Sequence, residues 1–414
     1  MQVLLVAAAL LRAGLGSPLQ SALQHVMDEK TAFYKQRGAT GFQLSWKSGT
    51  EEFTIASGTA GTREMTKEDT FLFGSGVKPF TASLVMKRWE EGKLDLNATV
   101  AHYIDPLFKE KLGKTFVELF GPNATRMTVW HLMTMQSGIP DFDVPAFDSY
   151  MLWERGSDPT FTPLDIVQYA ASQPWTCLPG ECVYYTSTNY ILLGYVLLAV
   201  AGKSIDAWES FDQRDVALLP KFADLHFVNS GPVSKFLTVP GFSADGGGKA
   251  IVNTSANILG WTCGNLAGTS RAMASWMWEL LVARSIVGAK ALELMADVRP
   301  ISYGWGHPWL DYGAGLFVQQ LDSRKLTRPV HYGDWGTTLG HGGDTYGFIS
   351  DQGFIPQLNA TFSWVGNSDG GLSNFDITCS IINAAAAVVL GIKEPFKCSS
   401  FQAPLRIQQH ELIV

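Results

Sequence analysis

The sequence predicts an α+β protein in which terminal helices cover an antiparallel sheet and a mainly helical subdomain is inserted between its strands. Strand-like alternation is confined to the two ends of the chain, at 41–62, 312–321, 344–355 and 360–369. Helical patterns dominate from about 77 to 275, and the clearest are at 127–138, 162–173, 189–202 and 269–284. A final helix is expected over 374–391. The order strand, helices, strand is what predicts this fold class.

Composition limits the function before any motif is considered. The 414 residues are 46% hydrophobic and 17% charged, enough for one large domain or two closely joined parts. The net charge of −7, without any run rich in lysine and arginine, argues against a nucleic-acid partner. A small or neutral substrate is expected, and no cofactor or metal.

The N-terminus has features of export. Residues 1–16 carry a short apolar run followed by small residues and are interpreted as a signal peptide, with a docked N-terminal helix as the alternative. Four sequons, at Asn97, Asn123, Asn253 and Asn359, fit a secreted, glycosylated chain. The apolar stretch at 384–391 is too short to span a membrane. The main folded domain is expected over 17–395, followed by a tail at 396–414, in a secreted or secretory-lumen protein.

The cysteine pattern is neither a disulfide scaffold nor a metal site. The five cysteines are Cys177, Cys182, Cys263, Cys379 and Cys398. In an oxidising compartment, Cys177 and Cys182 could close the loop CLPGEC. If the chain is not exported, five reduced core cysteines become the better interpretation.

The segment FLFGSGVKPF places a serine and a lysine three residues apart, where an apolar run gives way to a helix. Pro79 fits only the opening turn of that helix, where its missing N–H leaves no bond unmade. Ser75 is therefore expected near the helix N-terminus, with Lys78 on the same face one turn later. The structural alternative is a capping Ser75 and a solvated Lys78.

Two further segments carry chemically useful side chains. Tyr185 and Ser187 come just before a predicted helix in PGECVYYTSTNYILLG. His341, Gly342 and Gly343 enter a strand-like run in LGHGGDTYGF. The alternative for Tyr185 is a packed aromatic residue, and for His341 a structural loop histidine.

Together, in this order and context, the motifs resemble those of the serine β-lactamase-related hydrolases, which include class C β-lactamases, D-alanyl-D-alanine carboxypeptidases and family VIII esterases. The matching motifs are S-x-x-K at Ser75 and Lys78, Y-x-N at Tyr185-Thr186-Ser187, and K/H-x-G at His341-Gly342-Gly343. The resemblance extends over about 25–392 and implies a β-lactamase/transpeptidase-like fold.

The resemblance also implies roles for these residues. A serine hydroxyl is a poor nucleophile until a base takes its proton, and Lys78 can do so only if its pKa falls from about 10.4 toward neutrality. Burial would lower that pKa. Tyr185 would relay a proton to the leaving group, and His341 would help polarise the network. The oxyanion would lie between the backbone N–H groups of Ser75 and Asp344.

Two departures from the family pattern bear on the substrate. Ser187 replaces an asparagine and offers one donor instead of two. Gly342 replaces the hydroxyl residue that helps bind a substrate carboxylate in many carboxypeptidases and β-lactamases. Gly343 is retained and would let substrate approach the strand edge. A carboxylate-free ester or amide is therefore expected.

Other polar segments have simpler interpretations. Asp141 and Asp143, which follow the helix that stops at Ser137-Gly138, could line the cleft but are expected to be solvated. The run ADGGGKAI lacks the first glycine and the final Ser/Thr of a phosphate-binding loop, so a flexible turn is expected.

The sequence thus predicts a secreted, metal-independent serine hydrolase that forms an acyl-enzyme on Ser75 and cleaves an ester or a small amide or peptide bond. One alternative is β-lactamase or D-alanyl-D-alanine carboxypeptidase activity. Another is a catalytically weak pseudoenzyme that keeps the fold as a binding module, which the intact Ser75, Lys78, Tyr185 and His341 oppose and Ser187 favours. The natural substrate, protein partners and oligomeric state stay open.

Overall fold

The fold follows from a computed structural model. It describes residues 16–243, 249–251, 254–305, 310–325, 329–393 and 395–398. The predicted signal peptide, apart from Gly16, lies outside the described residues, as do the Asn253 sequon, most of the run ADGGGKAI and the tail beyond residue 398.

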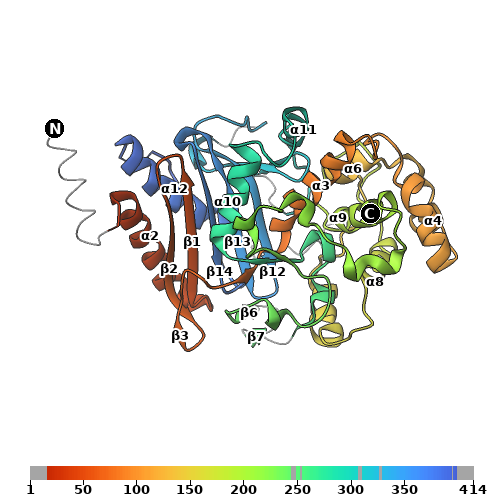
Figure 1. Cartoon of the computed structure of the whole chain (residues 1–414), viewed down its shortest axis with the longest axis horizontal. Coiled ribbons are helices and arrows are strands. Elements are labelled where there is room, and N and C mark those ends of the chain that lie inside the picture. The colour runs from red at the N-terminus through yellow and green to blue at the C-terminus, as the bar shows by residue number, and fades with distance from the viewer. Residues whose placement is uncertain are drawn as a thin grey trace.

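Nine strands form the central sheet, in which the beginning and the end of the chain meet because β1 pairs with β14 (Figure 1). In spatial order the strands are β3 (Arg63–Glu64), β2 (Glu52–Ala60), β1 (Gly41–Ser48), β14 (Ala360–Gly366), β13 (Phe348–Ile355), β12 (Thr337–Thr345), β11 (Phe317–Gln320), β10 (Leu310–Tyr312) and β9 (Arg299–Pro300). All neighbouring pairs are antiparallel. The predicted α+β class with an antiparallel sheet is confirmed.

Helices cover both faces of this sheet. They are α2 (Pro18–Tyr34) and α12 (Asn374–Leu390) on one face, and α10 (Ser270–Leu281) on the other. Alternation along β1 explains the division, since successive side chains of a strand point to opposite faces. Leu44 and Trp46 are buried in the apolar cluster with α2 and α12. Gln43 alternates with these residues and points to the opposite face. There its side-chain oxygen accepts hydrogen bonds from the backbone N–H and the hydroxyl of Ser270 on α10.

The remaining helices form the inserted helical part, most of which lies to the right of the sheet and of α10 in Figure 1. They are α3 (Lys78–Glu90), α4 (Val100–Leu112), α5 (Phe116–Phe120), α6 (Val129–Met133), α7 (Pro145–Tyr150), α8 (Pro163–Ala171), α9 (Thr188–Val200) and α11 (Ala289–Met295). Small antiparallel sheets accompany them, made of β4 (Phe71–Leu72), β8 (Leu266–Gly268) and β5 (His226–Phe227), and of β6 (Gly241–Ser243) and β7 (Lys249–Ile251). No single helix among the described residues has both the length and the apolar composition of a membrane span, although the bent pair 188–200 and 205–216 meets both conditions together.

Several predicted boundaries differ from the structure. The run expected over 312–321 contains the end of β10, a turn and β11, and the run expected over 344–355 contains the end of β12, a turn and β13. The helix expected over 127–138 ends at Met133, because the chain turns at Met135, whose φ is +58°. The helix expected over 269–284 was assigned to the end of the helical subdomain, but as α10 it packs on β1, β13 and β14. Its apolar stripe cannot distinguish a sheet surface from a helical neighbour, since both bury it equally.

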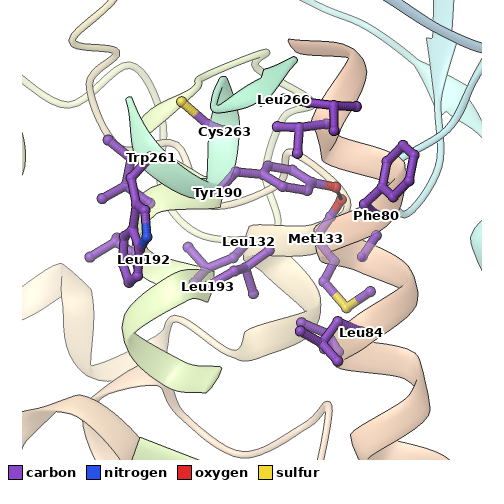
Figure 2. Close-up of a cluster of buried hydrophobic side chains, with 14 of the residues drawn as sticks. Phe80, Leu84, Leu132, Met133, Tyr190, Leu192, Leu193, Trp261, Cys263 and Leu266 are labelled. Carbon is purple, nitrogen blue, oxygen red and sulfur yellow. Dashed lines mark hydrogen bonds between the residues drawn. The ribbon is translucent and has the colours of Figure 1, made fainter. Parts of the chain in front are cut away.

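The core of the helical part surrounds Tyr190 of α9 (Figure 2). Its ring is fully buried, and its hydroxyl donates a hydrogen bond of 3.0 Å to the backbone oxygen of Met133. Phe80 of α3 stacks on Trp276 of α10, with ring centroids 3.5 Å apart and planes at 19°. This stack joins the helical core to the helix that lies on the sheet.

Two disulfides constrain the chain. The expected Cys177–Cys182 bond is present, and a second bond, Cys379–Cys398, ties α12 to the segment that follows it. Cys263 is buried as a free thiol. Both bonds are compatible with an oxidising compartment.

We expect Phe80→Ala to lower the free energy of unfolding by about 3–5 kcal/mol, because it leaves a cavity against Trp276. Phe33→Ala is the matched control, since Phe33 is 54% exposed and its loss should cost about 0.5 kcal/mol. Urea denaturation of the two variants measures the difference. Equal losses would show that the stack does not stabilise the fold.

Candidate active site

Ser75 lies in a single 3₁₀ turn, Gly74–Val77, that runs directly into α3. It is half-buried, whereas Lys78, the first residue of α3, is fully buried. The spacing of three residues brings their side chains together, with Lys78 Nζ 2.7 Å from Ser75 Oγ. The serine therefore faces the outside while its neighbouring amine is enclosed by protein.

Three oxygen atoms surround the amine of Lys78. Besides Ser75 Oγ, they are the hydroxyl oxygen of Ser187 and the backbone oxygen of Cys263, each 3.3 Å from Nζ. A carbonyl can only accept, so the contact with Cys263 uses one N–H. If Ser187 accepts a second, the lone pair of a neutral amine is left to face the Ser75 hydroxyl. This geometry suits proton transfer from Ser75 to Lys78.

Electrostatics favours that neutral amine. Burial lowers the pKa of Lys78 from its ordinary 10.5, although negative charge on Cys263, Asp141 and Asp143 would oppose the shift. A carbonyl and hydroxyls are its direct partners, and no carboxylate among the described residues lies within 4.0 Å of its nitrogen. Desolvation therefore dominates, because no ion pair compensates for it.

Tyr185 stands beside the amine, with its ring centroid 5.2 Å from Lys78 Nζ. Its backbone N–H donates to the Tyr303 oxygen at 3.1 Å, which fixes the loop that carries it. Burial raises the pKa of Tyr185 well above 10, and the Ser75 hydroxyl opposes this only in part. The phenol is buried and forms no hydrogen bond of ordinary length and angle with any described residue. It is therefore a protonated group, suited to donate and unsuited to act as a base.

His341 is fully buried on β12, and its two hydrogen bonds define its tautomer. Nδ1 lies 2.5 Å from the Gly342 carbonyl oxygen, which must accept, so Nδ1 carries the proton. Nε2 then accepts from the Tyr312 hydroxyl at 3.0 Å. Burial, with the charge of Lys78, lowers the pKa of His341 to about 3. Neither hydrogen bond of this neutral imidazole reaches Ser75 or Lys78, and together they hold the ring in place.

Two glycines allow β12 to lie against the serine turn. A Cβ at Gly343 would sit 1.8 Å from the Phe73 backbone oxygen, and one at Gly74 would sit 2.4 Å from the Asp344 oxygen. Gly74 also has φ of +48°, which disfavours any side chain. The strand that carries His341 and Asp344 therefore flanks Ser75 because both contact positions lack a side chain.

A side chain at Gly342 would point away from the turn that carries Ser75. A Cβ there would approach Asn374 Nδ2 and the Trp305 ring at 3.1 Å each. Trp305, which is half-buried, also lies parallel to His341, with ring centroids 6.4 Å apart. A larger residue at Gly342 would have to displace one of these neighbours.

Several residues of the site were not expected from the sequence. Asp141 was expected to be solvated, but it is half-buried and accepts a 2.9 Å hydrogen bond from the backbone N–H of Ser187. Tyr312 meets His341 only through the pairing of β10, β11 and β12. The Cys263 contribution is a backbone oxygen, for which side-chain identity carries no signal. Of these residues, the sequence pointed only to Asp141, because an acidic loop after Ser137-Gly138 could line the cleft.

Three of the predicted glycosylation sites lie on the surface, away from Ser75 and Lys78. Asn97, Asn123 and Asn359 are exposed, as a glycan requires, and Asn253 is not described. Within the described residues, no group of three or more His, Cys, Asp or Glu side chains is arranged to hold a metal ion.

Comparisons with known proteins show which family and fold the chain shares. A family model described as Beta-lactamase matches residues 31–378. D-amino acid amidase from Ochrobactrum anthropi SV3 is 21% identical with a TM-score of 0.70, and D-stereospecific amidohydrolase from Streptomyces sp. is 21% identical with 0.69. Each match covers 90% of this chain and 99% of the other. An octameric penicillin-binding protein homologue from Pyrococcus abyssi is 22% identical, with a TM-score of 0.68 over 90% of this chain and 78% of its own. Identities this low establish a shared fold.

We expect Gly343→Ala to reduce turnover of an ester substrate severely and to destabilise the protein by about 1–3 kcal/mol, because the added Cβ forces β12 away from Phe73. Gly49→Ala is the matched control, since no atom lies within 4 Å of its added Cβ. Turnover and thermal melting of both variants are measured together. A fully active Gly343→Ala enzyme would contradict the close approach.

Stability should depend on pH through His341. Its folded-state pKa of about 3 lies below the ordinary 6.5, so below pH 6.5 the unfolded chain binds a proton that the folded protein does not. The wild type should lose up to about 1.4 kcal/mol per pH unit from this group as pH falls from 6.5 toward 3. Chemical denaturation of wild type and His341→Gln measures this, because their stability difference should shrink across that window. A constant difference would mean that His341 titrates normally.

Proposed function

This chain belongs to the Beta-lactamase family, whose members are serine hydrolases, and we propose that it hydrolyses a small ester, amide or peptide bond through an acyl-enzyme on Ser75. The observation that carries the proposal is the enclosed amine of Lys78, 2.7 Å from the half-exposed Ser75 hydroxyl and without a carboxylate partner. A nucleophile and its base within hydrogen-bond reach are the signature of covalent catalysis.

The reaction begins when Ser75 Oγ attacks the substrate carbonyl carbon and its proton passes to Lys78. The new C–O bond moves an electron pair onto the carbonyl oxygen, which the backbone N–H groups of Ser75 and Asp344 would stabilise in the proposed arrangement. Collapse of this intermediate breaks the bond to the leaving group. Tyr185, the protonated phenol beside the amine, donates the proton that the leaving group needs, and Lys78 returns a proton to Tyr185.

Deacylation uses the same groups with water as the nucleophile. Water attacks the acyl carbonyl, a proton passes to Lys78, and Ser75 Oγ leaves and is reprotonated. The contrast between a lowered Lys78 pKa and a raised Tyr185 pKa supports this division, with the amine as base and the phenol as acid. His341 holds Tyr312 and the adjoining aromatic wall in place.

The substrate class is proposed from the site and from its neighbours. Gly342 offers no hydroxyl, and the closely packed Trp305 and Asn374 leave little room for one, which supports a substrate without a carboxylate contact there. Two structural neighbours are named as a D-amino acid amidase and a D-stereospecific amidohydrolase, which favours small amides. Penicillin-binding protein homologues among the neighbours keep β-lactam or D-alanyl peptide hydrolysis as the second candidate.

Export is part of the same proposal. The apolar segment at 1–16 is the proposed signal peptide, and the Cys177–Cys182 and Cys379–Cys398 disulfides support passage through an oxidising compartment. The proposed hydrolase domain is 17–395, with the helical subdomain near 77–275 apart from the sheet-packing part of α10.

We expect Ser75→Ala to lower kcat/KM for a p-nitrophenyl ester by about 1,000-fold or more while the protein keeps its melting temperature, because a single reacting oxygen is lost. Ser83→Ala is the matched control on α3, since the Ser83 hydroxyl is buried and forms no hydrogen bond with any described residue. It should keep full activity. A fully active Ser75→Ala enzyme would identify another nucleophile.

Lys78→Met should abolish turnover to a similar degree, because a thioether of similar length cannot take the serine proton. A covalent acylating probe read by mass spectrometry separates two outcomes. Loss of labelling at Ser75 supports the role of Lys78 as the base for acylation. Labelling at the wild-type rate would assign that role elsewhere.

A further inference from the structure

Asp141 is a carboxylate at the active site without a cationic partner. Its Oδ1 accepts hydrogen bonds from the backbone N–H of Ser187 at 2.9 Å and from that of Asp143 at 3.2 Å. It forms no ion pair within 4.0 Å with any described Lys, Arg or His, although its charge acts on both Lys78 and Tyr185. The residue is half-buried, so it is not fully enclosed by protein.

The placement of Asp141 is costly because no ion-pair partner among the described residues offsets its burial. Burial, with the nearby Asp143 carboxylate, raises the pKa of Asp141 to about 7, and the attraction of Lys78 and the bond from Ser187 offset this only in part. Protein atoms surround much of the carboxylate, although the residue stays partly exposed. A positive group from outside the chain would restore the interaction that solvent no longer supplies.

Lys78 and Tyr185, the two polar groups beside Ser75 that the proposed reaction uses, have assigned partners or a proton to donate. Lys78 contacts Ser75, Ser187 and the Cys263 oxygen, so it cannot serve as the counter-ion without ceasing to be a base. Tyr185 is a protonated phenol whose pKa is raised by burial. Asp141 is an acceptor at this site without an ion-pair partner, and it would favour a substrate that carries a donor, preferably a cation.

We propose that Asp141 binds an ammonium group next to the scissile carbonyl, so that the substrates are amides or esters of amino acids with a free α-amino group. This inference rests on the proposed function, since it assigns the substrate class of the same site. A primary ammonium has three N–H donors and can bond to the carboxylate from its open side, leaving the Ser187 and Asp143 N–H bonds in place. The neutral amine expected for Lys78 makes this second positive charge tolerable.

A purely structural role for Asp141 predicts something different. If the carboxylate only held the Ser187 backbone, acetylation of the substrate amine would not change the effect of the residue. Asp141→Asn keeps the shape and an acceptor oxygen for the Ser187 N–H while removing the charge. The variant therefore separates recognition of a cation from positioning of the loop.

The test compares phenylalanine p-nitroanilide with N-acetylphenylalanine p-nitroanilide, as D and L forms, near pH 7, where both Asp141 and an α-amino group carry charge in part. The wild type should prefer the free amine by about tenfold or more in kcat/KM, and Asp141→Asn should reduce that ratio to about one. Asp143→Asn is the matched control, because Asp143 is exposed, and it should keep most of the preference.

A neutral p-nitrophenyl ester separates the possible failures. Wild type that cleaves this ester but does not prefer the free amine, or Asp141→Asn that keeps the preference, overturns this inference and leaves the proposed function standing. Wild type that cleaves none of these substrates, and is not labelled at Ser75 by an acylating probe, overturns the proposed function and this inference with it.

Discussion

The burial of one lysine amine is the constraint on which the rest of the site depends. Lys78 is enclosed between α3, the Ser187 loop and the Cys263 segment, and its contacts there are a hydroxyl pair and a carbonyl. In water this amine would be protonated and useless as a base. The apolar core around Tyr190 and Phe80 therefore has a chemical consequence. It keeps water away from the amine, and this burial lowers the pKa of Lys78.

The same constraint explains why sheet and helices must be joined so closely. In the proposed reaction Ser75 has to reach substrate while Lys78 stays enclosed, and a 3₁₀ turn against β12 would allow both. Gly74 and Gly343 make that contact possible, and the Phe80–Trp276 stack holds α3 against the helix that lies on the sheet. Precision at the reacting oxygen thus comes from rigid elements, which position groups better than loops do.

Sequence patterns predicted the elements better than their partners. Period-two alternation located β1 and β2, and the apolar helices α9 and α12 were placed within a residue or two. The helix after 127 was predicted too long because nothing in its pattern shows the left-handed turn at Met135. The sequence did not predict that the α10 segment lies on the sheet, since an apolar stripe does not record which surface covers it.

Local spacing by itself determined that Ser75 and Lys78 are neighbours, because residues three apart at a helix start share one face whatever surrounds them. The order of strand-like and helical patterns along the chain determined the antiparallel α+β class. Only the tertiary structure decided the state of those groups. The backbone oxygen of Gly342 defines the tautomer of His341, and Tyr312 reaches the other ring nitrogen across three strands. A backbone oxygen at Cys263 completes the lysine site, and Asp141 is half-buried instead of solvated. Protonation depends on burial and on distant partners, which spacing along the chain does not specify.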